Sequence, residues 1–561
     1  MKNQVNKKMI IILILVFFAI IIIGIFATQN LNKSSSEKEY DKAVSYINKY
    51  MKSIDVEKAD LVKSTVSLET TDLNDELPDI SEYPLSVEGK GEINIEVFSS
   101  PEKAGESTDG WLNEVATRFN NSNQTINGKK VSVSVRTIAS GASVDYIVSG
   151  KYVPESFSPS NELWASMVES QNVDLTQIDS GIAKNTAGIL LSQTTYDALK
   201  EKYGEVNLQS VVQATINNEI AMGYTNPYAS STGMNFLIST LSYFDSENPL
   251  SSTAVSGFQK FQENVPFVSY TTMQMRTAAE SGSLDAFIME YQTYYNDNSL
   301  KNNYIFVPFG ERHDSPMYAV GKLSDEKNQL LKLFTSYCKS EEMQNLATQY
   351  GFNNNSDYIF EGTNYNGDTL TKAQKLWKEE KDSGKPIIAV FVTDVSGSMS
   401  GTPLTQLKQS LMNSMQYINS NNYIGLVSYS TDVTINLPID QFNLNQKSYF
   451  SGAVNRLTAN GNTSTFDAII VAADMLIKKQ EEVPDSKLMM FVLSDGETNS
   501  GHSLLEATNV VKNLNIPIYT IGYNADISAL EDISAINEAA SINADSDDVI
   551  YQLKNLFNSN L

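Results

Sequence analysis

The stretch P-I-I-A-V-F-V-T-D-V-S-G-S-M-S-G, from Pro386 to Gly401, joins a strand pattern to a cluster of oxygen-bearing side chains. Its first eight residues are mostly apolar or β-branched, which is typical of a buried strand in a parallel sheet. Asp394, Ser396 and Ser398 follow two residues apart, and a helical pattern then runs from Leu404 to Ile418. Carboxylate and hydroxyl oxygens suit a hard cation. Because open α/β sheets bind ligands at the carboxyl ends of their strands, the stretch predicts a metal site there.

Two later loops offer further oxygen ligands. Thr463 lies in N-G-N-T-S-T-F-D, just before a helical pattern, and Asp495 follows the apolar strand pattern of Lys487 to Leu493. The order of a carboxylate with two serines, then a threonine, then an aspartate resembles the metal-ion-dependent adhesion site of von Willebrand factor type A (VWA) domains. The resemblance covers residues 386–561. It implies a doubly wound, Rossmann-like α/β sheet.

The same resemblance implies a ligand set for Mg²⁺, Mn²⁺ or Ca²⁺. Ser396, Ser398 and Thr463 would contact the metal directly, while Asp394 and Asp495 would bind it directly or through water. The sixth position would be left for a carboxylate of a protein partner. The alternative is a domain of this fold that has lost its metal, but none of the five ligand positions is lost.

An enzymatic alternative rests on Gly397–Gly401, which resembles the G-x-S-x-G turn of α/β-hydrolases with the serine one position late. Ser400, Asp495 and His502 would then form a triad in the right chain order. However, the last two lie close together in one loop, and this interpretation leaves the threonine and the first carboxylate unexplained. We therefore expect a non-enzymatic protein.

Composition limits the remaining possibilities. A chain of 561 residues exceeds what one hydrophobic core usually supports, so several domains are expected. The 41 basic and 66 acidic residues give a net charge of −25, which argues against a nucleic-acid partner because phosphate contacts need a basic surface. The single cysteine, Cys338, excludes an intrachain disulfide, and two histidines exclude a histidine-rich zinc site.

The N-terminus is predicted to be a membrane anchor followed by a spacer. Residues 9–27 are a continuous apolar run long enough to span a bilayer, after a lysine-rich tail at residues 1–8. That charge bias places the tail in the cytoplasm and the bulk of the chain outside the cell membrane. A cleavable signal ending near Gly24–Thr28 is the alternative. Residues 28–91 are polar and acidic, and we expect an extracellular stalk.

Residues 92–360 show α/β patterning and resemble type II extracellular solute-binding proteins, which have a two-lobed periplasmic-binding fold. The resemblance rests on a series of segments in order: I-N-I-E-V-F-S-S-P, S-P-S-N-E-L-W, M-G-Y-T-N-P-Y-A-S-S-T-G-M-N-F-L, S-G-S-L-D-A-F-I-M-E-Y and S-E-E-M-Q-N-L-A-T-Q-Y-G-F. A polar linker at 361–385, containing one short helix that docks on one neighbour, would lead into the last domain.

In that fold the ligand lies between the lobes, against loops that open helices. Hydroxyls and free amides at a helix start suit an anion or a polar solute. The candidate residues are Ser99, Ser100, Ser158 and Ser160 from one lobe and Asn226, Ser230, Ser231, Thr232 and Gly233 from the other. Helix capping is the alternative role for each serine. Glu290 and its neighbouring tyrosines could line the cleft or belong to the core.

Together these features predict a membrane-anchored extracellular binding protein. Its VWA domain would capture a protein partner, and its solute-binding-like domain would sense or present a ligand. A small-molecule sensor or receptor is the first alternative, and a serine hydrolase using Ser400 is a remote one.

Overall fold

The computed structural model describes most of the chain beyond its N-terminus. The described residues are 35–66, 73–265, 267–269, 275, 284–355, 357–496, 498–514, 516–523, 541–544, 553, 556–557 and 560–561. No helix within these ranges is long and apolar enough to cross a bilayer, and the predicted span at 9–27 lies outside them.

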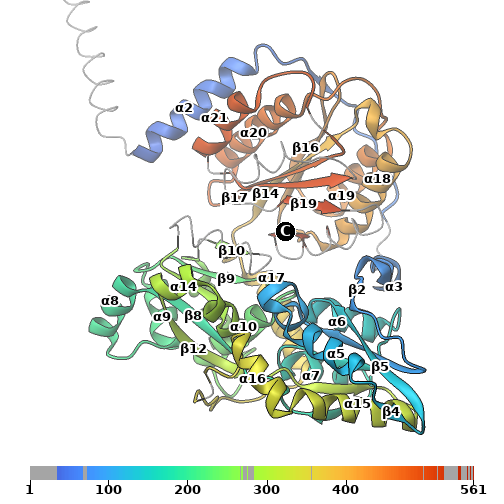
Figure 1. The fold of residues 1–561 in the computed structure, drawn as a ribbon. Coiled ribbons are helices and arrows are strands. Elements are labelled where there is room, and N and C mark those ends of the chain that lie inside the picture. Colours follow the sequence, from blue (N-terminus) through green and yellow to red (C-terminus); the bar gives the residue numbers. More distant parts are fainter. Residues whose placement is uncertain are drawn as a thin grey trace, which may run out of the picture.

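The C-terminal part is a sheet with helices on both faces (Figure 1). Its strands are β14 (Ile387–Asp394), β15 (Tyr423–Tyr429), β16 (Val433–Gln441), β17 (Lys487–Ser494), β18 (Ile518–Tyr523) and β19 (Ser541–Ala544). Its helices are α18 (Thr402–Ser414), α19 (Leu444–Asn455), α20 (Thr465–Glu482) and α21 (Leu504–Leu514). β14 is buried throughout and pairs in parallel with β15 and β17, whereas β16 runs antiparallel to β15. Alternate residues of β14 pack into the two cores, Val390 with α20 and Phe391 with α19.

The segment before the solute-binding-like domain also belongs to this sheet, which corrects the expectation of a stalk over 28–91. Helix α2 (Ser35–Tyr50) packs against α20 and α21, and strand β1 (Val56–Lys58) pairs in parallel with β16. Ala43 and Ile47 are buried at this contact, so the weak helical period in the sequence marks a packed face. The solute-binding-like domain is therefore inserted between the first elements and the remainder of the C-terminal domain.

The middle of the chain forms two lobes. The first lobe has strands β2 (Leu85–Val87), β3 (Ile93–Ser99), β4 (Thr125–Ile126), β5 (Lys129–Thr137), β6 (Ser156–Ser158), β7 (Leu175–Asp179) and β13 (Met317–Val320), with helices α3 (Leu73–Glu76), α4 (Pro101–Ala104), α5 (Trp111–Asn121), α6 (Ser140–Ser149), α7 (Glu162–Ser170), α15 (Asp325–Cys338) and α16 (Glu341–Gln349). The second lobe has β8 (Thr186–Ser192), β9 (Met222–Thr225), β10 (Phe267–Ser269), β11 (Ala286–Glu290) and β12 (Tyr304–Arg312), with α8 (Gln193–Tyr203), α9 (Leu208–Ile216), α10 (Ser231–Phe244), α11 (Ser252–Gln262), α13 (Tyr291–Asn296) and α14 (Asn298–Asn303). The chain passes from the first lobe to the second between β7 and β8 and returns between β12 and β13.

The predicted linker at 361–385 contains a helix, α17 (Gly367–Glu380), that packs against both lobes and not against one neighbour. It contacts α7 of the first lobe and α10 and α11 of the second. Trp377 is fully buried and donates its indole N–H to the Tyr224 hydroxyl at 2.7 Å. Lys378 donates to the carbonyl of Tyr417 in the C-terminal domain. This helix therefore contacts both lobes and the C-terminal domain.

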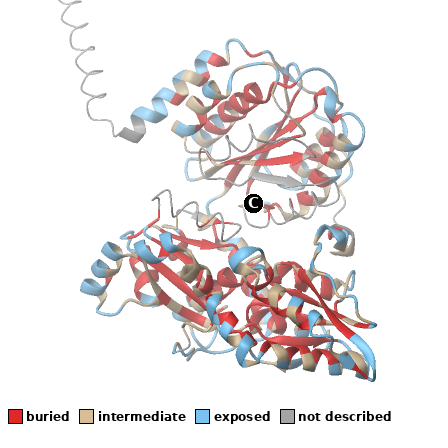
Figure 2. Ribbon diagram, viewed as in Figure 1, coloured by how far each residue is buried: buried red, intermediate tan, exposed pale blue. Residues whose placement is uncertain are grey.

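Burial follows the strands and the inner helix faces in both parts of the molecule (Figure 2). Cys338 is buried in the first lobe, as expected for a small core side chain, and burial raises the pKa of its thiol. One core cluster contains residues of both lobes and of α17, including Phe98, Phe236 and Trp377. The lobes are therefore closed against each other.

Candidate functional site

Asp394 ends the central strand β14 and is held by both neighbouring loops. The backbone N–H of Ser396 donates to its Oδ1 at 2.8 Å, and the Ser494 hydroxyl donates to its Oδ2 at 2.6 Å. Ser396 Oγ and Ser398 Oγ lie 3.0 Å apart. Ser398 in turn donates to Asp495 Oδ1 at 2.9 Å. The two carboxylates and two serines thus form one connected cluster.

The loop that carries Thr463 is tied to the same cluster by its backbone. Gly397 N–H donates to the Gly461 carbonyl at 3.0 Å, and Thr463 N–H donates to Asn499 Oδ1 at 2.9 Å. Gly461 has φ of +75°, and a Cβ there would lie 2.7 Å from Thr431 Oγ1, so glycine is required for the turn. All three sequence-predicted loops therefore meet at the carboxyl edge of the sheet.

This cluster has a buried side and an open side. Asp394, Ser396 and Thr463 are buried, whereas Ser398 is exposed and Asp495 is half-buried. Burial raises the pKa of Asp394, partly offset by the hydrogen bonds from Ser494 and Ser396. Burial also raises the pKa of Asp495, with the Ser398 hydrogen bond opposing it. Two partly desolvated carboxylates disfavour their own charged forms, and a nearby cation reverses that preference.

The donor set fits a hard divalent cation, because it consists of carboxylate and hydroxyl oxygens from three loops. Within the described ranges, no three His, Cys, Asp or Glu side chains gather as a potential metal site. Hydroxyl oxygens would have to complete this set, as the sequence pattern predicts.

The hydrolase alternative requires His502 to pair with Asp495, and the structure does not show this pair. His502 Nδ1 lies 2.5 Å from Asp467 Oδ1, and the backbone N–H of His502 donates to the same oxygen at 2.8 Å. Asp495 instead accepts from Ser398. The triad of the hydrolase alternative, Ser400, Asp495 and His502, is therefore not formed, because His502 contacts Asp467 in the first turn of α20.

In the first lobe, the candidate cleft serines have two kinds of surroundings. Ser99 and Ser158 end the paired strands β3 and β6, are buried, and have hydroxyls without a hydrogen-bond partner among the described residues. Ser100 donates to Glu102 Oε1 and accepts from Lys103 Nζ, both at 2.5 Å. Lys103 is fully buried, and this burial lowers its pKa while the charge of Glu102 opposes the effect. Ser100 therefore belongs to a buried ionic group.

In the second lobe, Ser230 and Gly233 build the start of α10. Ser230 Oγ accepts from Gly233 N–H at 3.2 Å and from Thr225 Oγ1 at 2.8 Å. A Cβ on Gly233 would lie 2.1 Å from the Thr225 carbonyl oxygen, so the glycine allows close packing on β9. The capping alternative describes the observed contacts of Ser230.

Ser231 and Thr232 connect this helix start to other elements. Ser231 Oγ accepts from Trp164 Nε1 at 2.8 Å and donates to Ser160 Oγ at 3.0 Å, which joins the two lobes. Thr232 Oγ1 donates to Glu290 Oε1 at 2.9 Å. Both side chains are buried, and the Ser231 hydroxyl links the two lobes, whereas Thr232 bonds within the second lobe.

A buried polar network centres on Glu290 and His313. His313 Nδ1 lies 2.6 Å from Glu290 Oε1, while its Nε2 lies 2.9 Å from Asn161 Nδ2 and 3.0 Å from Asn235 Nδ2. Burial acts to lower the pKa of His313, but the nearby carboxylates, first Glu290 and then Glu102 and Glu311, together outweigh burial and raise it. The sequence did not indicate His313 or the two asparagines, because the network is assembled from separate segments.

Four buried polar atoms around the cleft residues have no partner among the described residues. They are Ser99 Oγ, Ser158 Oγ, Asn226 Nδ2 and Ser269 Oγ. The last two lie side by side, since Asn226 N–H donates to the Ser269 carbonyl at 2.8 Å. Buried polar groups are normally paired, so such atoms mark places for water or a polar ligand.

Comparisons with known proteins match two stretches of the chain to two families. Residues 104–353 match the family described as bacterial extracellular solute-binding protein, and residues 389–558 match the von Willebrand factor type A domain. The chain therefore carries a bacterial extracellular solute-binding domain followed by a C-terminal VWA domain.

Relatives at the sequence level include heavy chains of inter-alpha-trypsin inhibitor. Heavy chain H3 of Bos taurus is 32% identical over 182 residues, covering 29% of this chain and 20% of that protein. Heavy chain H4 of Bos taurus is 28% identical over 157 residues, covering 26% and 16%. The chain thus spans about a fifth of the length of the curated relatives it matches.

Similar solved structures cover each domain separately. The periplasmic binding protein AfuA of Actinobacillus pleuropneumoniae matches with a TM-score of 0.38 and 12% identity, covering 52% of this chain and 98% of that one. A von Willebrand factor type A protein of Catenulispora acidiphila matches with a TM-score of 0.29 and 15% identity, covering 31% and 42%.

Proposed function

We propose that the VWA domain captures a carboxylate-bearing protein partner through a divalent cation, Mg²⁺ or alternatively Mn²⁺ or Ca²⁺. The residues that would hold it are Asp394, Ser396, Ser398, Thr463 and Asp495. The observation that carries the proposal is the hydrogen-bonded convergence of three loops that present these oxygens around one open edge of the sheet.

Each residue of the cluster has a distinct part in this function. Asp394 is fixed by Ser494 and by the backbone of Ser396, so its position does not depend on a partner. Ser398 and Asp495 lie on the accessible side, where a partner can approach. A bound cation would supply an open coordination position for a carboxylate of the partner.

The direct test is the melting profile of the full chain with Mg²⁺, Mn²⁺, Ca²⁺ or EDTA. A ligand that binds the native state raises its apparent stability with concentration. We expect a metal-dependent rise in one transition that Asp394→Ala abolishes. Asp485→Ala is the matched control, because Asp485 is exposed at the opposite end of β17 and should leave the rise intact. An equal rise in Asp394→Ala, or partner capture in EDTA, would refute the proposal.

A second function, sensing of a polar or anionic solute, is favoured by the unpartnered buried atoms of the cleft. Ser99 and Ser158 present free hydroxyls from the first lobe, and Asn226 and Ser269 present polar atoms from the second. A solute that accepts and donates hydrogen bonds there would satisfy groups that are otherwise buried without partners. This ligand would govern how the inserted domain presents the VWA domain.

The double variant Ser99→Ala with Ser158→Ala tests this second function cleanly. Neither hydroxyl bonds to a described residue, so the variant should keep its melting temperature. We expect it to lose the thermal shift that a panel of small anions and polar solutes produces in the wild type. If no solute shifts the wild type, or the variant responds equally, the cleft is not the binding site.

We also propose that residues 9–27 anchor the protein in the cell membrane, with residues 1–8 in the cytoplasm and both domains outside. Protease added to intact cells should then remove the VWA domain while the protein fractionates with the membrane. Release into the medium of a chain that lacks the residues before about Gly24–Thr28 would argue for the cleavable signal.

A further inference from the structure

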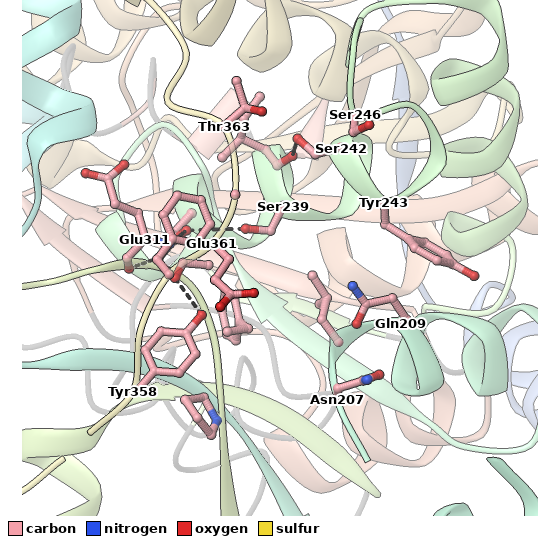
Figure 3. A pocket seen from close by; sticks show the side chains of 18 of the residues that line it. Asn207, Gln209, Ser239, Ser242, Tyr243, Ser246, Glu311, Tyr358, Glu361 and Thr363 are labelled. Carbon is pink, nitrogen blue, oxygen red and sulfur yellow. Dashed lines mark hydrogen bonds between the residues drawn. The ribbon is translucent and has the colours of Figure 1, made fainter. Parts of the chain in front are cut away.

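A cavity of about 680 Å³ lies mostly on the second lobe, and Leu163 of the first lobe also lines it (Figure 3). It is bounded by α9, α10 and β12 on one side and by residues 358–365 on the other. None of the residues predicted to bind the cleft ligand is among its described lining residues. The cavity is thus a second concave site, and its size is in the range of sites for small molecules.

The wall formed by residues 358–365 is fixed in place by tyrosine hydroxyls. Tyr358 donates to the Gly310 carbonyl at 2.8 Å, and Tyr365 donates to the Ser246 carbonyl at 2.9 Å. Ser242 of α10 donates to the Tyr365 hydroxyl at 2.9 Å. Both ends of this segment are therefore attached to the second lobe by hydrogen bonds. The same segment continues directly into α17, which touches both lobes.

The described lining carries acidic side chains and no basic one. Glu205, Glu311 and Glu361 line the cavity, and its described lining includes no lysine, arginine or histidine. No ion pair to any of the three glutamates is found in the part of the chain that the structure describes. Burial, followed by the charge of Glu162, raises the pKa of Glu311 to about 7. An anion would be repelled here, whereas a cation would relieve the repulsion.

The same cavity has apolar and aromatic surfaces beside these carboxylates. Phe309, Phe360, Tyr243 and Tyr358 line it, and their ring faces can attract a cation as well as an apolar chain. Ile359 also lines it with 74% of its surface exposed, although it is a large apolar side chain. A ligand that combined positive charge with an apolar body would cover this surface.

We propose that this cavity binds a small organic cation of the alkylammonium class. The ammonium group would lie against Glu311 and Glu361, and the hydrocarbon part would lie along Phe309 and Ile359. A bare metal ion fits poorly, because aromatic rings and apolar side chains make up much of the lining. The cavity shares Asn235 with the buried network around His313, but none of the residues proposed to bind the cleft ligand or the VWA cation lines it, so it adds a function to those proposed above.

Calorimetric titration of the full chain with 1,5-diaminopentane, beside neutral 1,5-pentanediol, tests the assignment. We expect saturable binding of the diamine and none of the diol, with affinity falling as salt is added. Glu361→Gln should weaken diamine binding about tenfold and leave the fold intact, because Glu361 is exposed. Glu88→Gln removes the same charge from an exposed site in the first lobe and should leave binding unchanged.

Three results would overturn the proposal. These are no saturable diamine binding at millimolar concentration, equal binding of the diol, and equal weakening by Glu361→Gln and Glu88→Gln. The last would mean that the diamine responds to the overall net charge of −25 and not to this cavity. Because the titration contains EDTA and no divalent metal, its outcome does not depend on the VWA metal cluster.

Discussion

The proposed metal cluster of the VWA domain and the interlobe cleft both gather polar side chains, but the hydrogen bonds and charges around those side chains differ. In the metal cluster, Ser398 is exposed and Asp495 half-buried, and the two carboxylates have no cationic partner in the described structure. In the cleft, Glu290 is paired with His313, and Ser231 bridges to Ser160 of the other lobe. The first arrangement leaves two carboxylates without a cationic partner among the described residues, whereas the second pairs its carboxylate and links the two lobes. Removing a charge should therefore have opposite consequences at the two sites.

The largest effect is expected from His313→Ala in the cleft. The variant leaves the Glu290 carboxylate buried without its imidazole partner, and breaking a buried pair in this way costs about 3–5 kcal/mol. Trp111, Trp164 and Trp377 all lie in the solute-binding domain or α17, so tryptophan fluorescence in urea reports that region alone. Asp495→Ala is the matched control at the metal cluster, and it should leave this fluorescence transition unchanged. A loss below about 1 kcal/mol in His313→Ala would mean that the pair contributes little net stability.

A smaller effect is expected when pH changes the charge of His313 in the cleft, and it should appear as a change in the stability of the solute-binding domain. The folded pKa of His313 is raised by Glu290, with Glu102 and Glu311 acting in the same direction. A group with a raised folded pKa stabilises the folded state fully below its unfolded pKa, and this stabilisation is lost as pH rises through the folded value. The stability difference between the wild type and His313→Gln should therefore shrink as pH increases above about 6.5. A difference that is constant between acidic and alkaline pH would contradict this assignment.

These two sites also differ in how far the sequence predicts them. The convergence of the carboxylates Asp394 and Asp495 was predictable, because β14 and β17 are parallel neighbours and their carboxyl ends must meet at one edge. Asp394 and Asp495 are therefore brought together by the strands that precede them. The solute-binding fold was also recognisable, and the family comparison confirms it.

The cleft network and the N-terminal segment were not predictable in the same way. His313 lies between two strands of different lobes, and its contacts with Asn161 and Asn235 arise from the closure of the lobes. The burial of Ile47 depends on α21, which lies more than four hundred residues later in the chain. A polar helical pattern with few apolar positions looks the same whether it forms a stalk or covers an existing sheet. Tertiary packing decides between the two.

The smallest effect is expected from Asp394→Asn at the metal cluster, and it is a gain in stability where the cleft variants lose stability. Because burial raises the folded pKa of Asp394, its charged form destabilises the metal-free protein at neutral pH. Asparagine has the same shape without the charge, and it can accept from the Ser396 N–H while donating to the Ser494 hydroxyl. In EDTA, calorimetry should show the VWA transition of the variant about 2–4 °C higher than that of the wild type. This is the shift that about 1 kcal/mol gives in a domain of this size.

Millimolar Mg²⁺ should then raise the transition temperature of the wild type and leave that of the variant unchanged. The exposed Asp485→Asn is the control, and it should behave as the wild type does in both conditions. A variant less stable than the wild type in EDTA would mean that the carboxylate is satisfied by its hydrogen bonds alone, and that the contrast between the two sites does not hold.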